Sequence, residues 1–432
     1  GKANIVNKTQ TSMIEVPIEQ IKTIPALLGE VDIIKAIQLL PGVQSSEGTS
    51  GFYVRGGGPD QNLILLDGVP VYNASHIGGL FSVFNADAIK SVSLTKGGFP
   101  ARFGGRLSSV LQIDMKEGNS KELKGDFTLG LVSSKFTLEG PIIKDKTSFI
   151  ISGRRTYIDL IAAPFINATN VPGSETDLTL YFYDLNAKIN HKISKKNRLY
   201  LSAYTGRDKL GVDFSEDLSD QYSLEQSSLN FGLGYGNITS TLRWNHLFND
   251  KLFSNTTLTY SRYSFNTDFG VSSNYTENNE TETWDINFGY ISGIEDLGAR
   301  IDFDYIPNPN HEIKFGASYT NHFFFPGETS LSINETQPNP SENFSLDTTI
   351  NFSDNIKANE VFFYAEDNLN ITPRLKANIG IHIGIYNSNN ITNTNIISEI
   401  DDTENWSIQP RISARYLIND LWSVKGSYAE MT

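Results

Sequence analysis

The pattern of hydrophobic and polar residues changes near residue 123 and from there alternates with the period of a β-strand. Clear examples run from Glu312 to Phe323, from Leu375 to Ile385 and from Trp406 to Tyr416, with Ile238 to Phe248 as a further case. In each segment one face is apolar, whereas the other carries polar or charged side chains. Alternation of this kind predicts strands whose two faces meet different surroundings. We therefore expect antiparallel β-structure over most of the chain.

Charge on the polar faces distinguishes two kinds of antiparallel sheet. The packed interior of a β-sandwich would not accept these charged groups cheaply, whereas a wide water-filled or plugged lumen would. On alternation alone, a soluble antiparallel sheet with one face in water is the alternative. The lengths of the connections between strands decide between the two.

The connections between the predicted strands alternate between short and long. Outer-membrane barrels have this asymmetry, because short turns lie on the periplasmic side and long loops lie outside. A sandwich has no reason to follow it, so the pattern predicts a transmembrane β-barrel. Short turns are predicted at 144–146, 194–197, 249–250, 307–310, 372–373 and 419–420, and long polar connections near 158–179, 207–227, 270–283, 326–357 and 387–405.

The number of predicted strands is about 13, whereas bacterial single-chain barrels close with an even number. The sequence also stops at Glu430-Met431-Thr432, just inside a predicted strand. We therefore expect the chain to be the N-terminal part of a longer barrel. Barrels of about 22 strands with a plugged lumen are typical of outer-membrane transporters.

The residues before about 120 form short and mixed elements instead. Glu30 to Leu40 predicts a helix, and strands are predicted at 52–54, 63–66 and 91–95. Glycine pairs and triplets between them indicate tight turns. We expect a compact α+β domain inside the barrel, with a linker at 1–20, the compact domain at 21–120 and the barrel part at 121–432.

The composition of the chain excludes several classes of partner and chemistry. The net charge is -14, so we expect no nucleic-acid partner, because phosphate binding needs a basic face. Cysteine is absent, which excludes disulfides, thiolate catalysis and Cys-ligated metals. No apolar run approaches the length of about 18 residues that a transmembrane helix needs. The histidines are scattered without metal-ligand spacing, so we expect no metal cofactor. A loop position explains the pair Asp401-Asp402, and an external Ca²⁺ in an acidic loop stays open.

Several motifs in the first 120 residues follow one another in a fixed order. They include Leu40-Pro41-Gly42-Val43-Gln44, Tyr53-Val54-Arg55-Gly56-Gly57, Leu66-Asp67-Gly68-Val69-Pro70-Val71-Tyr72-Asn73 and Gly97-Gly98-Phe99-Pro100-Ala101-Arg102-Phe103-Gly104-Gly105-Arg106. On these residues the region resembles the plug domain of TonB-dependent outer-membrane receptors, especially those of the Bacteroidota. The resemblance implies a transport receptor and not an enzyme.

The resemblance also implies a function and a location. The function is active uptake of a nutrient ligand such as a siderophore, vitamin, glycan or peptide, across the bacterial outer membrane. The implied partners are the TonB–ExbB–ExbD system, outer-membrane lipids and a surface lipoprotein lid over the barrel mouth. The N-terminus of the plug is expected to face the periplasm. The alternative is a receptor-like barrel that acts as a structural or signalling subunit of a larger outer-membrane complex.

The segment that receives TonB is expected just before the plug, where an extended peptide can pair with TonB as an added strand. Ile14, Glu15 and Val16 are the candidate residues, and an ordinary first strand or linker is the alternative interpretation. A small β-sandwich domain precedes the plug in many such receptors, and the sequence shows no sign of it.

Two arginines are candidates for pairing between plug and barrel. Arg55 follows a predicted strand and precedes glycines, and the resemblance implies that it pairs with acidic groups on the barrel wall or within the plug. Arg106, after Gly104-Gly105, is a second candidate. Asp67 opens a turn with Gly68, and turn chemistry explains it.

One plug loop is a candidate for ligand contact. The segment from Tyr72 to Phe81 mixes aromatic, amide and imidazole groups with glycine. The resemblance implies that such loops face the outer vestibule and touch substrate. Tyr72, Asn73, His76 and Phe81 are therefore the expected contact residues, with plain packing as the alternative.

Overall fold

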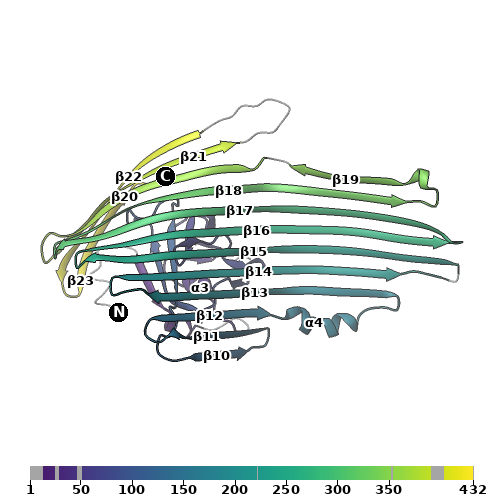
Figure 1. The fold of residues 1–432 in the computed structure, drawn as a ribbon, viewed down its shortest axis with the longest axis horizontal. Helices are drawn as coiled ribbons and strands as arrows, with labels where there is room; N and C mark the ends of the chain where they lie inside the picture. Colours follow the sequence, from purple (N-terminus) through teal and green to yellow (C-terminus); the bar gives the residue numbers. More distant parts are fainter. Residues whose placement is uncertain are drawn as a thin grey trace.

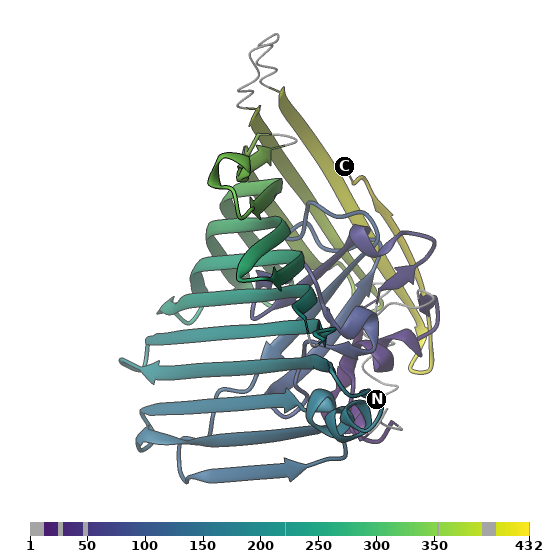
Figure 2. The same ribbon diagram turned by 90° about the vertical axis from the view of Figure 1, so that its right-hand side faces the viewer.

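The computed structural model describes residues 13–24, 29–45, 51–220, 222–351, 354–390 and 403–431. In these residues the chain forms a small mixed domain, the plug, and a large curved antiparallel sheet that forms part of a barrel wall. Figure 1 shows the long strands side by side with the plug behind them. Figure 2 shows the sheet curving round the plug. The predicted fold class, an α+β plug inside an antiparallel barrel, is confirmed.

The plug is built on a five-stranded sheet in the order β1-β8-β9-β4-β5. β4 and β9 run parallel, and the other neighbours pair antiparallel. The plug elements are β1 (Met13–Pro17), α2 (Ile18–Ile21), α3 (Ile33–Gln38), β2 (Val43–Ser45), β3 (Phe52–Val54), η1 (Pro59–Gln61), β4 (Asn62–Leu66), β5 (Val69–Pro70), β6 (Ser75–His76), η2 (Ile77–Gly79), β7 (Phe81–Ser82), β8 (Ile89–Lys96) and β9 (Ser109–Met115).

Helix α3 is shorter than the predicted helix at 30–40. It begins after Asp32, whose carboxylate accepts the N–H of Lys35 at 2.9 Å and caps the helix. Ile33, Ile34 and Ile37 are fully buried and fix the helix on the plug sheet. The helix therefore extends only as far as this cap and this apolar stripe support it.

Residues 13–17 belong to the plug sheet and not to a linker that ends at residue 20. β1 pairs with β8 over its whole length, from Met13 with Thr95 to Pro17 with Ser91. The backbone of this segment is therefore satisfied along one edge by the plug itself. In the described residues, the interpretation of Ile14, Glu15 and Val16 as an ordinary first strand agrees with this pairing, and contact with TonB stays a prediction.

The barrel part is a single 14-stranded sheet, in which β19 pairs only with β18 and lies off the main path. The predicted count of about 13 agrees with the main path. The strands are β10 (Lys124–Leu129), β11 (Ser133–Ile143), β12 (Thr147–Thr156), β13 (Ser174–Lys192), β14 (Asn197–Asp217), β15 (Ser223–Asn249), β16 (Leu252–Glu277), β17 (Glu280–Asn308), β18 (His311–Thr336), β19 (Phe344–Asn351), β20 (Ile356–Asn370), β21 (Leu375–Asn390), β22 (Thr403–Asn419) and β23 (Trp422–Ala429), with helix α4 (Ile158–Asn167) between β12 and β13 and η3 (Pro340–Glu342) before β19.

The predicted short turns all connect strands at one end of the sheet, on the left in Figure 1. Several predicted long loops are wrong, because the strands continue through them. Residues 207–217 lie in β14, 270–277 in β16 and 326–336 in β18. Hydrogen bonds to the neighbouring strands satisfy the backbone there even though the residues are polar. The polar side chains of these segments therefore indicate exposure to water, and they do not indicate the end of a strand. The predicted loop at 387–405 lies partly outside the described residues.

The plug occupies only part of the length of the barrel wall. Figure 1 shows it behind the left parts of the long strands, whereas β13 to β18 continue to the right beyond it. The chain passes from plug to wall between Met115 at the end of β9 and Lys124 at the start of β10, close to the predicted boundary at 120. Among the helices in the described ranges, none is long and apolar enough to cross a membrane.

Candidate functional site

The plug has an apolar core of its own. The main cluster of buried apolar residues comes from the plug, with Tyr204 of β14 as the single barrel residue in it. A second cluster, Leu65, Phe99, Phe103 and Val110, also lies in the plug. The contacts between plug and barrel wall are instead mainly hydrogen bonds and ion pairs. The two parts therefore meet across a polar interface, and this interface is the candidate functional site.

His76 is the centre of the first group of interface contacts. Its Nε2 lies 2.8 Å from Oδ1 of Asp184 on β13, and its Nδ1 lies 2.5 Å from Oδ2 of Asp208 on β14. The next residue, Ile77, donates its N–H to the other oxygen of Asp208 at 2.7 Å. Phe182 stacks on the imidazole with ring centroids 4.0 Å apart. β6 thus inserts a buried histidine between two carboxylates of the wall.

These carboxylates determine the charge of His76. Burial disfavours the imidazolium, but the negative charge and hydrogen bonds of Asp184 and Asp208 outweigh it and raise the pKa of His76 above its usual value. The protonated ring donates from both nitrogens, which matches two carboxylate acceptors. The contact is therefore a charge-assisted bridge from plug to wall.

Arg154 of β12 completes this group. Its Nε and Nη2 donate to Oδ2 of Asp184 at 2.9 and 2.5 Å, and Nη2 also donates to the carbonyl of Ser82 in the plug at 2.7 Å. Its Nη1 lies 3.5 Å from Oε2 of Glu30, a buried plug carboxylate that also accepts a hydrogen bond from Ser133 of the wall. We call His76, Arg154, Asp184, Asp208 and Glu30 the interface charge cluster. All five residues are at most 5 % exposed.

A second ion pair crosses the interface at Asp67. Lys188 of β13 places its Nζ 2.9 Å from Oδ2 of Asp67. Arg243 of β15 donates to the Asp67 carbonyl at 2.8 Å, and Met115 donates its N–H to Oδ1 at 3.0 Å. Asp67 has a φ of 49°, which agrees with the predicted turn. Turn chemistry explains the backbone of Asp67, whereas its side chain also anchors the plug.

The plug loop around residues 99–106 forms a third contact, with strands β20 to β22. Arg411 donates to the carbonyls of Pro100, at 2.8 Å, and of Phe103. Glu366 accepts the N–H of Ala101 at 2.7 Å, and a ring nitrogen of His382 lies 2.8 Å from its carbonyl. Buried wall side chains thus hold this loop by its backbone.

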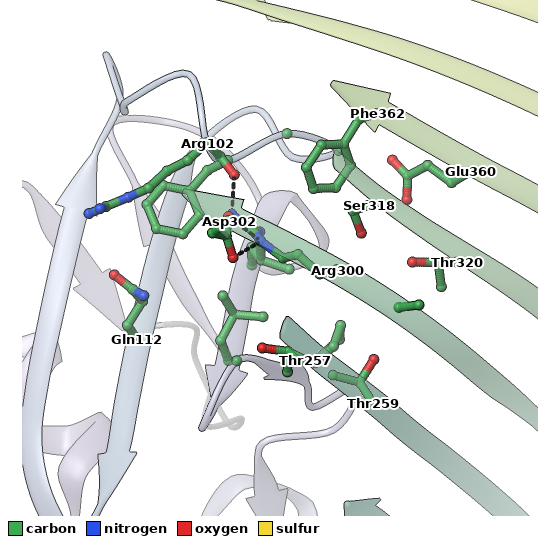
Figure 3. Close-up of a pocket in the computed structure, with 18 of the residues that line it drawn as sticks. Arg102, Gln112, Thr257, Thr259, Arg300, Asp302, Ser318, Thr320, Glu360 and Phe362 are labelled. Carbon is green, nitrogen blue, oxygen red and sulfur yellow. Dashed lines mark hydrogen bonds and ion pairs between the residues drawn. The ribbon is translucent and has the colours of Figure 1, made fainter. Parts of the chain in front are cut away.

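A cavity of about 360 Å³ lies between the plug and the wall strands β15 to β20. Figure 3 shows hydroxyl and charged side chains of the wall across from Arg102 and Gln112 of the plug. Arg300 donates to Asp302 with Nε at 2.8 and 2.9 Å and reaches the carbonyl of Arg102 at 3.2 Å. The charged and titratable residues that line the cavity are Arg102, Arg106, Arg243, Arg300, Lys314 and His322 together with Asp114, Asp296, Asp302, Asp304 and Glu360.

The structure divides the four predicted ligand-contact residues. Tyr72 lines the cavity and hydrogen-bonds to Asp296, and burial next to this carboxylate raises its pKa well above its ordinary value. The Asn73 carbonyl accepts from Asn237 of the wall at 2.7 Å. His76 and Phe81 are both 1 % exposed in the docked plug, in contact with wall residues, and their contact with ligand stays a prediction. For Tyr72 and Asn73, ligand contact stays a prediction.

The two predicted pairing arginines lie in different surroundings. Arg55 is exposed, has a φ of 50° and lies beside Gly97 within the plug. Arg106 lines the cavity, and its positive charge acts on Tyr72. Its guanidinium donates to the carbonyl of Gly105 at 2.6 Å. The ion pairs described above are made by other residues, and pairing of Arg55 or Arg106 with the barrel stays a prediction.

Sequence reasoning missed most of the residues that hold the plug. Arg154 and Lys188 are charged residues whose neighbours two positions away are polar, which marks a lumen-facing position. Asp184 has Phe182 and Asp208 has Leu210 at this spacing, so the pattern does not mark their faces. For none of the four does it tell which plug residue lies opposite. In the described part of the chain, no group of three His, Asp or Glu side chains is arranged to hold a metal ion. Asp401-Asp402 lie outside the described residues, and an external Ca²⁺ in an acidic loop stays a prediction.

Comparison with known families identifies the chain. A family model described as the TonB-dependent Receptor Plug Domain matches residues 6–109, and one described as TonB dependent receptor-like, beta-barrel matches residues 149–430. The chain therefore belongs to the TonB-dependent receptor family, whose members are transport receptors with barrels in the outer membrane. No curated protein matches the chain.

Three solved structures are similar in fold. The siderophore receptor PiuA of Acinetobacter baumannii is 12 % identical with a TM-score of 0.57, over 99 % of this chain and 67 % of that one. BauA, the ferric preacinetobactin receptor of Acinetobacter baumannii, is 11 % identical with a TM-score of 0.61, over 98 % and 64 %. Fiu, the ferric-catecholate import receptor of E. coli K12, is 14 % identical with a TM-score of 0.59, over 98 % and 66 %. The chain thus spans about two thirds of their length.

Proposed function

We propose that the chain forms the plug and part of the wall of an energised outer-membrane importer that takes up a nutrient ligand. The observation that carries this proposal is the contrast between the two kinds of contact in the plug. Its apolar core lies almost entirely inside the plug, whereas its contacts with the wall are mainly polar. A domain with its own core can leave the wall without unfolding, and the polar groups that it exposes are readily hydrated.

The interface charge cluster suits a plug that must be held and then released. A buried group of ion pairs contributes little net stability compared with apolar packing, because desolvation offsets the attraction. It does specify one docked position, since a displaced plug would leave charges without partners. Mechanical force applied through TonB, ExbB and ExbD to the plug, whose N-terminus faces the periplasm, then separates two preformed surfaces. The cavity beside Tyr72 is the place where such a separation begins to open a path.

Ferric siderophores are the first candidates for the ligand, because the similar structures are named as siderophore receptors. A vitamin, a glycan or a peptide are the other nutrients to test. Outer-membrane lipids around the barrel and a lipoprotein lid at its mouth belong to the proposal for a receptor of the Bacteroidota type. The names of the similar structures favour uptake over a structural or signalling subunit.

Uptake in cells with and without TonB tests the proposal. Cells that carry the full receptor would be given labelled iron as catecholate and hydroxamate siderophores, and separately labelled cobalamin and maltohexaose. We expect one class to accumulate at least tenfold faster in the cells that contain TonB. Accumulation at equal rates in both cells would contradict an energised importer.

A further inference from the structure

The apolar face of several wall strands changes sides along their length. In the half of β15 near the short turns, Ile238, Leu242 and Trp244 are exposed and share one face. Farther along the same strand, Leu229, Phe231 and Leu233 occupy the opposite face. Successive side chains of a strand point to opposite faces, and the first set has even residue numbers whereas this set has odd ones. The intervening residues of the second half are glycine, asparagine and serine. The strand therefore has two halves with inverted polarity.

Contacts with the plug show which face is the lumen. Tyr235 of β15 accepts the N–H of Gly78 through its hydroxyl at 3.0 Å, and Asn237 contacts Asn73. Both are an even number of residues from Phe231, so Phe231 shares their face. On β16, Ser261 donates to the carbonyl of Pro70 at 2.7 Å and is likewise an even number of residues from Phe269. The apolar residues of the far halves therefore face the lumen.

Strand register joins these residues into rows. Val212 of β14 lies opposite Phe231, Phe231 opposite Phe269, Phe269 opposite Phe288 of β17, and Phe288 opposite Leu331 of β18. Directly opposite residues in an antiparallel pair share one face, so this row is continuous across five strands. We call it the apolar belt.

A second row lies parallel to the first, two residues farther from the plug, and we include it in the apolar belt. It consists of Phe214, Leu229, Val271, Ile286 and Ile333, in the same strand order. Three side chains of these rows are exposed, since Leu229, Phe269 and Phe288 are 38 %, 40 % and 41 % exposed, and the other seven are half-buried. Figure 1 shows the reason, because the plug ends before this part of the strands.

The outer face of the same part of the wall is polar. One register row there consists of Asp213, Asn230, Gly270, Asn287 and Ser332. Such a row is unsuited to lipid, so this part of the wall extends beyond the membrane into water. An apolar lumen inside a wall with a polar exterior has no role in membrane insertion. It needs another occupant, because exposed contiguous apolar surface marks an interaction site.

We propose that the apolar belt is a capture surface for a small molecule with an extended aromatic or other apolar body. This inference deepens the proposed uptake function, on which it rests, by naming the chemistry of the ligand. Three phenyl rings, from Phe231, Phe269 and Phe288, stand in consecutive positions along the row. Aromatic rings in such a row offer faces and edges to a flat apolar ligand, which binds without requiring directional hydrogen bonds.

The dimensions of the belt favour a small molecule over a protein. Five strands at a spacing of about 4.8 Å span roughly 20 Å, and the two rows together cover about 10 Å along the strands. This area is on the order of 200 Å², whereas a standard protein interface buries about 800 Å² on each partner. The surface is also the inner side of a curved wall, and concave apolar surfaces are typical of small-ligand sites.

The belt is distinct from the cavity beside the plug. Phe269 is eight residues along β16 from Ser261, which lines the cavity, and this corresponds to about 26 Å of extended strand. The cavity lining includes hydroxyl groups and charged residues of both signs, whereas the belt is apolar. A ligand captured at the belt therefore meets the plug only in a later step.

The test uses 8-anilino-1-naphthalenesulfonate, a dye with an aromatic body, and the full receptor in lipid nanodiscs, with empty nanodiscs as the blank. Trp284 lies four residues before Phe288 on the same face of β17 and is 40 % exposed. Since the chain also contains Trp244, Trp406 and Trp422, the part of the energy transfer to the dye that is lost in Trp284→Phe reports binding at the belt. The variants are Phe269→Ser with Phe288→Ser, the conservative pair Phe269→Leu with Phe288→Leu, and the control Ile291→Ser on the outer face of β17.

We expect the serine pair to raise the dye Kd at least tenfold, which is about 1.4 kcal/mol. The leucine pair and Ile291→Ser should stay within about threefold of the unchanged receptor, and maltohexaose should not displace the dye. Heat-modifiable migration on gels checks that each variant is folded, and Phe231→Ser replaces the serine pair if that pair is not. Equal binding by the serine variant and the unchanged receptor, or equal loss with Ile291→Ser, would overturn the proposal. Dye binding is measured without TonB, so a negative result would contradict the belt proposal without contradicting energised uptake.

Discussion

Replacing Arg154 with methionine is the sharpest perturbation of the polar interface. Methionine keeps much of the length of the side chain but removes all the donors that Arg154 presents to Asp184, Glu30 and the carbonyl of Ser82. Both carboxylates are buried, at 2 % and 4 % exposure, so water cannot replace the lost charge while the plug is docked. Only His76 would then balance the acidic groups of the interface charge cluster.

The magnitude follows from breaking one partner of a buried ion pair, which costs about 3–5 kcal/mol. Since each 1.4 kcal/mol changes an equilibrium tenfold, the undocked plug should become on the order of 10²–10⁴ times more populated. The perturbation acts on docking and not on folding of the plug, because the core of the plug does not contain Arg154.

A single cysteine at position 241 provides the assay, because the chain has no cysteine of its own. Thr241 is 3 % exposed on β15 and shares the lumen face of that strand, so a maleimide reaches it only when the plug leaves the wall. Arg207→Met is the matched control, since Arg207 is exposed on the outer face of β14 and donates to Asn266 at 2.7 Å. Labelling should accelerate about 100-fold or more with Arg154→Met and not with the control. Equal, slow labelling of both variants would refute the docking role of the cluster.

Three further changes test other parts of the interface. Docking should weaken as the pH rises through the raised pKa of His76, because the docked ring holds a proton below that pKa and loses it above. The cysteine labelling rate should therefore increase with pH by more than the change in thiolate fraction explains. His76→Gln should remove this additional increase. Asp67→Asn should destabilise docking by about 3 kcal/mol, because Lys188 becomes a buried charge without its partner, and denaturant titration of the labelling rate would show no shift if the pair were unimportant. Gly118→Ala should lower the midpoint of thermal unfolding, because an added Cβ would lie 2.2 Å from the carbonyl oxygen of Phe149 at a φ of 77°, whereas Gly426→Ala has open space and should not.

Much of the fold could be predicted from the sequence. The alternation in segments such as Glu312 to Phe323 depends only on local spacing, so it identified β18 and its neighbours. The short turns were equally local, as in the pair of residues at 309–310. The lengths of the strands could not be predicted, because polar residues such as those at 207–217 occur both in loops and in strands that stand in water.

The site could be predicted much less well, because it depends on pairs that are distant in the sequence. His76 and Asp208 are 132 residues apart, and Asp67 and Lys188 are 121 apart. A histidine on a glycine-containing loop is compatible with ligand contact and with burial. Which of the two applies depends on the wall residues that lie opposite the loop. The inverted polarity of β15 is visible in the sequence, but the lumen face becomes known only when Asn237 is seen against the plug.

The central claim is that the plug must leave the wall for a ligand to pass, and a disulfide across the polar interface tests it most directly. The pair Asn73→Cys with Asn237→Cys would link plug and wall where the two residues already touch. The control pair Ser228→Cys with Ser272→Cys, whose hydroxyls are 2.7 Å apart, would link β15 to β16 without the plug. We predict that oxidation stops uptake of the nutrient identified above only in the first pair, and that a reductant restores it. Undiminished uptake with the oxidised plug–wall disulfide would contradict the account.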